Sequence, residues 1–133
     1  TSIRFCSSLC SFLMGMESPR DLYDSPLAGA LWETAVFTEL RRLLAGRGGW
    51  QVWYWRDRTK EADFLLHKAG RFLLADAKWS EHPSDPGKLR RIRSELDPYP
   101  PCALICRTDN PYPLGNDIQA IPLGSLSKLL GLT

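Results

Sequence analysis

The sequence predicts an α/β domain with a mixed sheet flanked by helices, in the order α-β-β-β-α-β followed by a short β-α tail. Three features predict this class: an amphipathic helical pattern comes first, three β-prone segments follow it, and a second helical pattern precedes a further apolar strand. Such alternation is typical of α/β folds. The length of 133 residues suits one domain, which we place at residues 26–133 after a lead-in segment over residues 1–25.

A long first helix is expected at residues 26–45. Ser25 is a typical N-cap, Pro26 suits the first helical position, and Gly46 ends the pattern. Glu33 falls on the apolar stripe of this helix, because hydrophobic side chains follow it at spacings of four and seven residues. A carboxylate on the buried side of a helix costs free energy, so its presence calls for an explanation.

The sheet is expected to begin with three consecutive strands. Ala69-Gly70 has the length and composition of a hairpin turn between the second and third of them. The expected strands are Gln51–Arg56, Glu61–Lys68 and Arg71–Trp79. The later elements are a helix at Lys88–Leu96, a strand at Cys102–Arg107, a short strand at Asp117–Leu123 and a terminal helix at Ser125–Leu132.

Composition excludes several classes of protein. Apolar residues make up 44% of the chain, which is typical of a globular domain, and no apolar run has the roughly 18 residues of a membrane-spanning helix. The four cysteines lack the spacing of a zinc site, so we expect structural thiols in a reducing, cytoplasmic compartment. The formal net charge is only +2, so any nucleic-acid contact must come from local clusters of cations. Because the chain starts with Thr1 rather than Met, we expect it to belong to a longer protein.

Two acidic residues and a lysine are expected on one face of the hairpin. With a two-residue turn at Ala69-Gly70, Asp63 lies directly opposite Asp76, and directly opposed residues point to the same face of a sheet. Lys78 follows Asp76 by two residues and so shares that face. Their Cβ atoms are then about 5 Å apart, and two carboxylates held that close repel each other unless a cation lies between them or one of them is protonated.

This arrangement suits a hard divalent cation, Mg²⁺ or Mn²⁺, which takes carboxylate, water and phosphate oxygens as ligands. Such an ion polarises a phosphodiester and activates an attacking water, which Lys78 would orient. Glu33 would add a ligand to Asp63 and Asp76 or hold a metal-bound water. A purely structural alternative stays open, with the aspartates in water at strand ends and Glu61 paired with Lys78 across the strands.

Longer segments around these residues resemble a known family. The segments are Gly29–Leu40 (GALWETAVFTEL), Val52–Arg56 (VWYWR), Glu61–Phe64 (EADF) and Ala75–Trp79 (ADAKW). They resemble the DUF4143 domain, which typically forms the C-terminal part of prokaryotic AAA+-type ATPases and whose core resembles the restriction-endonuclease-like PD-(D/E)XK nucleases. The signature of those nucleases is a helix glutamate, a strand aspartate and D/E-x-K on the next strand. By this resemblance the signature residues are Glu33, Asp63, Asp76 and Lys78. At the position of Asp76 the family more often has glutamate.

The resemblance implies a Mg²⁺- or Mn²⁺-dependent phosphodiesterase that acts on DNA and is attached to an AAA+ ATPase module. The alternative from another class is a catalytically inactive module that binds nucleic acid or protein and regulates that ATPase. The chain has no G-x-x-x-x-G-K-[ST] loop, so it carries no ATP site of that type.

Two further groups of residues are candidates for nucleic-acid contacts. The second helix carries a basic run that suits phosphates, although acidic residues four positions farther along also fit a solvated, salt-bridged face. Its members are Lys88, Arg90, Arg91 and Arg93. The aromatic residues in and directly before the first strand either stack on bases or pack in the core. They are Trp50, Trp53, Tyr54 and Trp55.

Overall fold

The computed structural model describes residues 20–21, 25–56, 62–83, 87–95, 100–115 and 117–132, with the backbone alone at 55–56 and 62–63. Most of the predicted lead-in segment therefore lies outside the described residues. The elements are α3 (Ala28–Leu44), β1 (Gln51–Arg56), β2 (Ala62–Lys68), β3 (Arg71–Ala77), α4 (Gly87–Ser94), β4 (Cys102–Ile105), β5 (Tyr112–Pro113), β6 (Ile118–Ile121), a 3-10 turn (Leu123–Ser125) and α5 (Leu126–Leu129). This order confirms the predicted α/β class.

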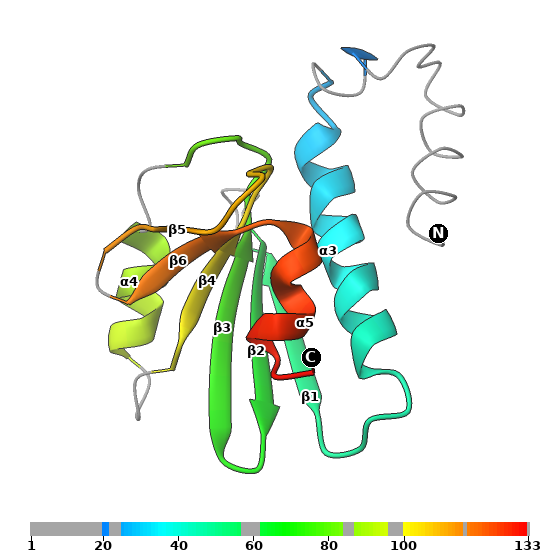
Figure 1. Ribbon diagram of the computed structural model, residues 1–133, viewed down its shortest axis with the longest axis vertical. Helices are drawn as coiled ribbons and strands as arrows, with labels where there is room; N and C mark the ends of the chain where they lie inside the picture. Colours follow the sequence, from blue (N-terminus) through cyan, green and yellow to red (C-terminus); the bar gives the residue numbers. More distant parts are fainter. Residues whose placement is uncertain are drawn as a thin grey trace.

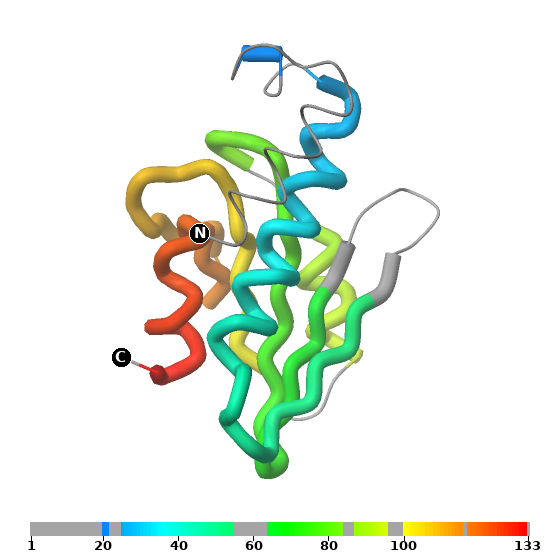
Figure 2. Tube along the Cα trace, turned by 90° about the vertical axis from the view of Figure 1, so that its right-hand side faces the viewer, coloured from blue at the N-terminus to red at the C-terminus, as the bar shows by residue number. Residues whose placement is uncertain are grey.

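The six strands form one mixed sheet in the order β1-β2-β3-β4-β6-β5. β1, β2 and β3 pair antiparallel, β3, β4 and β6 run parallel, and β5 pairs antiparallel with β6. α3 and α5 cover one face of this sheet and α4 covers the other (Figures 1 and 2). The domain is thus a three-layer structure with two hydrophobic cores, one on each side of the sheet.

The larger core lies between the sheet and the pair α3 and α5. Val36 and Leu40 of α3 pack there with Ala75 and Ala77 of β3. On the other face Leu89 of α4 packs with apolar side chains of the sheet. These sheet residues are Leu74, Cys102, Leu104 and Ile118. Alternate residues of β3 therefore belong to different layers, as the period of two in a strand requires.

The predicted hairpin turn is confirmed. Ala69 and Gly70 both have positive φ values, 51° and 81°, as a two-residue turn between right-twisted strands requires. His67 Nε2 accepts a hydrogen bond from Gly70 N at 3.2 Å, which holds the turn closed. The resulting register pairs Lys68 with Arg71 and Asp63 with Asp76.

Several local expectations were inaccurate. β3 ends at Ala77 rather than Trp79, β4 ends at Ile105 rather than Arg107, and α5 covers Leu126–Leu129 rather than Ser125–Leu132. The first helix begins at Ala28, because Ser25 closes a turn: its Oγ accepts a hydrogen bond from Leu27 N and its carbonyl accepts one from Ala28 N. The strand β5 was not predicted, since it has only two residues and one of them is a proline. For the β1 aromatics the sequence left stacking on bases and packing in the core open; Trp53 and Tyr54 are 45% and 44% exposed, although the Tyr54 ring lies 5.6 Å from that of Phe37 on α3.

The described helices include none that is long and apolar enough to cross a membrane. Cys102 and Cys106 are free thiols in the interior of the described structure. Both thiols therefore behave as small apolar groups in the core.

Burial raises the pKa of the Cys102 thiol from 9.0 to about 11. Between these values the unfolded chain releases a proton that the folded chain keeps, so the free energy of unfolding falls as the pH rises from 9 towards 11. We expect Cys102→Ala to show a shallower fall than the parent in urea unfolding across this range. Equal falls in the two proteins would contradict this assignment.

Candidate functional site

Asp76 and Lys78 lie at the edge of the sheet that the carboxyl ends of β3 and β4 form, at the upper end of the sheet in Figure 1. The two strands run parallel and end side by side, with Ala77 opposite Ile105. Two hydrogen bonds join the segments that follow them: Lys78 N donates to Ile105 O at 2.9 Å, and Arg107 N donates to Ser80 O at 2.9 Å. Ligands of open α/β sheets bind at this edge, outside the carboxyl ends of parallel strands.

Asp76 is the most deeply buried charged residue of this edge, with only 1% of its surface exposed. By strand alternation it lies on the face of Leu74, which α4 covers. Lys78 is half-buried just beyond the end of β3. The register places the backbone of Asp63 directly opposite Asp76, as predicted, although the side chain of Asp63 lies outside the described part. Glu61, the alternative partner of Lys78, also lies outside it.

Glu33 belongs to the other layer of the structure. It is 7% exposed on α3, whose Val36 and Leu40 pack against the opposite face of β3 from that of Asp76. The neighbouring Trp32 donates a hydrogen bond from Nε1 to Ile105 O at 3.0 Å, the oxygen that also accepts from Lys78 N. This shared carbonyl ties the start of α3 to the end of β3. Glu33, Asp76 and Lys78 all take part in polar or electrostatic interactions.

The basic run on α4 is split between exposed and half-buried positions. Arg90 and Arg91 are exposed, whereas Lys88 and Arg93 are half-buried. Arg93 Nη2 lies 3.9 Å from Asp117 Oδ2, while Asp97, its expected helix partner, lies outside the described residues. α4 covers the face of the sheet that carries Asp76, so its exposed arginines lie on the same side of the sheet as that carboxylate.

A cleft of about 780 Å³ opens beside this edge. It is lined by Trp32, Trp79, Glu81, His82, Arg107, Thr108 and Asp109. The rings of Trp32 and Trp79 lie 5.6 Å apart between centroids, and the Arg107 guanidinium lies 4.0 Å from the centroid of Trp79. Arg107 Nη1 is also 3.6 Å from Glu81 Oε1. This aromatic cleft is thus built around an arginine that a ring and a carboxylate hold in place.

Trp32, Trp79 and Arg107 are not among the functional residues predicted from the sequence. A signal was available for two of them, because Trp32 directly precedes Glu33 and Trp79 directly follows Lys78. Arg107 had no such signal, since only the parallel pairing of β3 and β4 brings it to Trp79. His82, a loop residue near Lys78 in sequence, also reaches the cleft.

Within the described part of the chain, no three His, Cys, Asp or Glu side chains form a group that could hold a metal ion. The predicted metal ligands are Glu33, Asp63 and Asp76. The side chains of Glu33 and Asp76 are described, whereas that of Asp63 is not. Carboxylate oxygens are the ligands that Mg²⁺ and Mn²⁺ take from proteins. The donor chemistry of the set therefore fits such an ion.

Comparison with known proteins gives a family match over most of the fold. The family named Domain of unknown function (DUF4143) matches residues 28–126. This chain is a DUF4143 domain. The uncharacterized proteins Rv2008c of Mycobacterium tuberculosis and Mb2031c of Mycobacterium bovis are each 28% identical to it over 127 residues, covering 90% of this chain. The chain spans 28% of the length of these relatives. No solved structure matches it.

The DUF4143 match begins at the first residue of α3 and ends at the first residue of α5. It includes both strands of the hairpin, the helix that carries Glu33 and the strand ends that form the cleft. The candidate site and the aromatic cleft of this DUF4143 domain therefore lie entirely within the region that the family shares.

If Asp76 holds a divalent cation in this DUF4143 domain, Mn²⁺ should raise its melting temperature by several degrees. An ion at 100 times its dissociation constant stabilises a fold by about 2.7 kcal/mol. Asp76→Asn should remove this shift, whereas Glu39→Gln should keep it, because Glu39 is a carboxylate of α3 whose partner is Arg42. Melting curves in EDTA and in Mn²⁺ measure the shift. A full Mn²⁺ response in Asp76→Asn would place the ion elsewhere.

Proposed function

We propose that this domain hydrolyses DNA phosphodiesters with a bound divalent cation, in a site of the PD-(D/E)XK type. The observation that carries the proposal is the register of the hairpin, which sets Asp63 opposite the buried Asp76, two residues before Lys78. This is the order of acids and lysine that the nuclease signature requires. The chain order of helix, three antiparallel strands, helix and parallel strand also agrees with that fold.

Asp63 and Asp76 would hold the ion, Mg²⁺ or Mn²⁺, and Glu33 would bind it or orient one of its waters. When bound, the ion supplies a Lewis acid for the phosphodiester and lowers the pKa of a coordinated water. Lys78 then orients the attacking water and offsets the negative charge that develops on the phosphate. The burial of Asp76 supports this assignment, because a low-dielectric site strengthens each of these charge interactions.

The aromatic cleft supports nucleic acid as the substrate. Trp32 is hydrogen-bonded to the carbonyl that also binds Lys78 N, so the cleft has a fixed position next to that lysine. Tryptophan rings stack on bases of any sequence, and an arginine beside them suits a phosphate. Arg90 and Arg91, exposed on α4, would contact the backbone of the same strand farther from the cleft.

A second candidate is a catalytically inactive module that binds nucleic acid or protein and regulates an attached AAA+ ATPase. The relatives support it, because the matched region is 28% of their length and is therefore one part of a larger protein in them. The two candidates differ in whether a bond is broken, so one assay separates them.

We expect the parent chain to cleave plasmid or single-stranded DNA in Mn²⁺. Asp63→Ala should abolish both cleavage and the metal-dependent rise in melting temperature, because it removes an ion ligand. Lys78→Ala should keep the rise in melting temperature but lower the cleavage rate by about 100-fold or more. Lys128→Ala, an exposed lysine of α5, is the matched control and should cleave like the parent.

Cleavage that survives both Asp63→Ala and Lys78→Ala would locate the activity in another site or in a contaminant. DNA binding by the parent without cleavage, in Mg²⁺ and in Mn²⁺, would reject the nuclease and favour the regulatory module.

A further inference from the structure

The opposite end of the sheet carries a second basic surface, which we call the hairpin-end surface. It consists of Arg41 and Arg47 near the end of α3, Lys68 and Arg71 at the β2–β3 turn, and Trp50 between these two pairs. Two clefts share Trp50: one of about 650 Å³ also borders Lys68 and Arg71, and one of about 400 Å³ also borders Arg41 and Arg47. Acidic residues are absent from the described lining of both clefts.

The β2–β3 turn forces two like charges together. Lys68 and Arg71 are directly opposed in the register, both are exposed, and paired residues of an antiparallel ladder point to one face. Like charges in this position lower the stability of a sheet. The turn that imposes the pairing includes Ala69, a residue other than glycine with a positive φ of 51°. The fold thus keeps the two mutually repelling cations Lys68 and Arg71 side by side at the β2–β3 turn.

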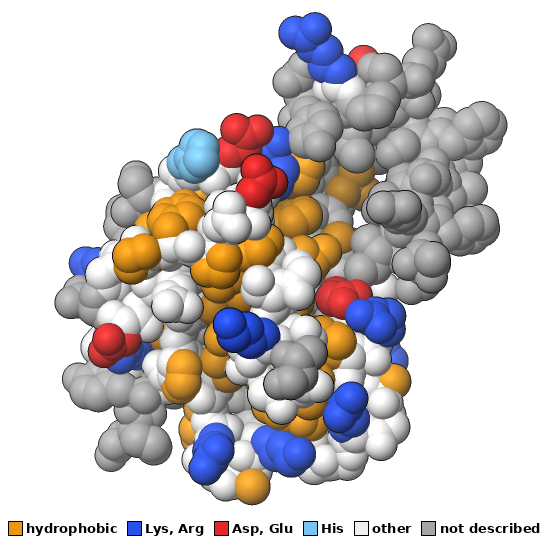
Figure 3. All heavy atoms as spheres, in the orientation of Figure 1, with side chains coloured by type: hydrophobic (Ala, Val, Ile, Leu, Met, Phe, Trp, Pro, Cys, Tyr) orange, Lys and Arg blue, Asp and Glu red, His pale blue; other side chains and the backbone are white. Residues whose placement is uncertain are grey.

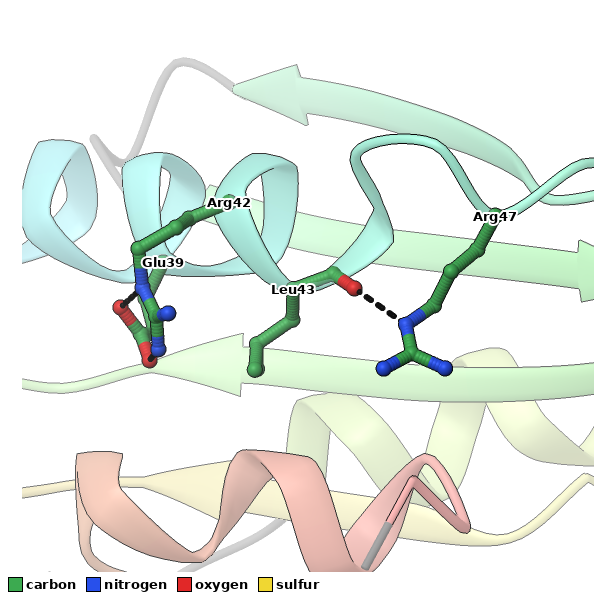
Figure 4. Close-up of polar contacts among 4 residues, drawn as sticks. All are labelled: Glu39, Arg42, Leu43 and Arg47. Atoms are coloured by element: carbon green, nitrogen blue, oxygen red, sulfur yellow. Dashed lines mark hydrogen bonds and ion pairs between the residues drawn. The ribbon is translucent and has the colours of Figure 1, made fainter.

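Trp50 and Arg47 extend this surface towards α3. Lys68 Nζ lies 5.5 Å from the centroid of the Trp50 ring, so a cation and a flat aromatic face lie together. Arg47 donates from Nε to the carbonyl of Leu43 at 3.0 Å, and Figure 4 shows its two terminal nitrogens pointing away from that bond. The Leu43 carbonyl at the helix end therefore holds Nε of Arg47, while the two terminal nitrogens take no part in that bond.

The charge distribution of the molecule agrees with this description. Lys and Arg side chains gather at the lower end of the face in Figure 3, while the coloured Asp and Glu side chains lie higher up or at the two sides. The carboxylate of Glu39 on α3 is hydrogen-bonded to Arg42, which lowers its pKa. A formal net charge of +2 for the whole chain thus conceals one strongly basic end.

We infer that the hairpin-end surface binds the phosphate backbone of single-stranded DNA, with Trp50 beside a base. Cations spaced around an aromatic ring are the combination that holds single strands without sequence preference. Arginine side chains pair with the oxygens of phosphates and of carboxylates alike. The Trp50 ring favours a nucleic acid over an acidic peptide, because only the nucleic acid has bases that can stack on it. The surface lies at the far end of β3 from the candidate site, roughly 20 Å away at about 3.3 Å per residue. It is therefore a separate site that goes beyond the proposed cleavage.

The test is binding of a fluorescent oligo-dT to the whole chain in EDTA, where metal-dependent cleavage cannot occur. The parent is compared with Lys68→Gln/Arg71→Gln and with the charge-conserving control Lys68→Arg/Arg71→Lys. Each phosphate contact to a single strand adds about 0.7 to the slope of log affinity against log salt, so the Gln variant should lose about 1.4. Its affinity should then change about sevenfold less than that of the parent between 50 and 200 mM salt.

The charge-conserving variant should keep the parent slope and melt near the parent temperature. The Gln variant should melt at or slightly above the parent temperature, because it removes the repulsion between two exposed residues that are directly opposed. An unchanged slope in the Gln variant, or no oligo-dT binding by the parent, would overturn the inference. Polyglutamate that competes as well as oligo-dT would also overturn it in favour of an acidic protein partner. The binding assay contains no divalent ion. Its result therefore stands whether or not the domain cleaves DNA in the separate Mn²⁺ assay.

Discussion

The turn at Ala69 and Gly70 fixes the pairing of β2 with β3, and both ends of the domain depend on that pairing. Side chains alternate between the faces of a strand, so a slip of one residue would exchange the two layers of β2. Phe64 and Leu66 would leave the core under α3, and Asp63 would no longer lie opposite Asp76. The hydrophobic core and the turn therefore enforce the same register. The acids at one end and the cations at the other are its consequences.

The carbonyl of Ile105 has a comparable role at the upper edge of the sheet. It accepts hydrogen bonds from the backbone of Lys78 and from the indole of Trp32, so it joins three elements at one oxygen. The two bonds orient Trp32 in the cleft and hold the first turns of α3 against the ends of β3 and β4.

Much of this arrangement is local and could be predicted from the sequence. A hairpin with two turn residues has one register, so the pairing of Asp63 with Asp76 followed from counting along the chain. The strand β5 could not be predicted, because two residues carry no periodicity. The aromatic cleft could not be predicted either, since Arg107 meets Trp79 only after β4 has aligned with β3. The metal roles of Glu33, Asp63 and Asp76 stay predictions, as does the role of Lys78.

The hydrogen bond from Trp32 to Ile105 joins residues that are 73 positions apart. By contrast, the β1–β2–β3 meander is held by contacts between neighbouring strands. Contacts between nearby residues form faster than distant ones, because closing a long loop costs more conformational entropy. We therefore expect the hairpin with its basic tip to form early and the upper edge to be completed last, when β4 docks. During synthesis the candidate site would accordingly be incomplete until β4 has left the ribosome, so a nascent chain would lack it.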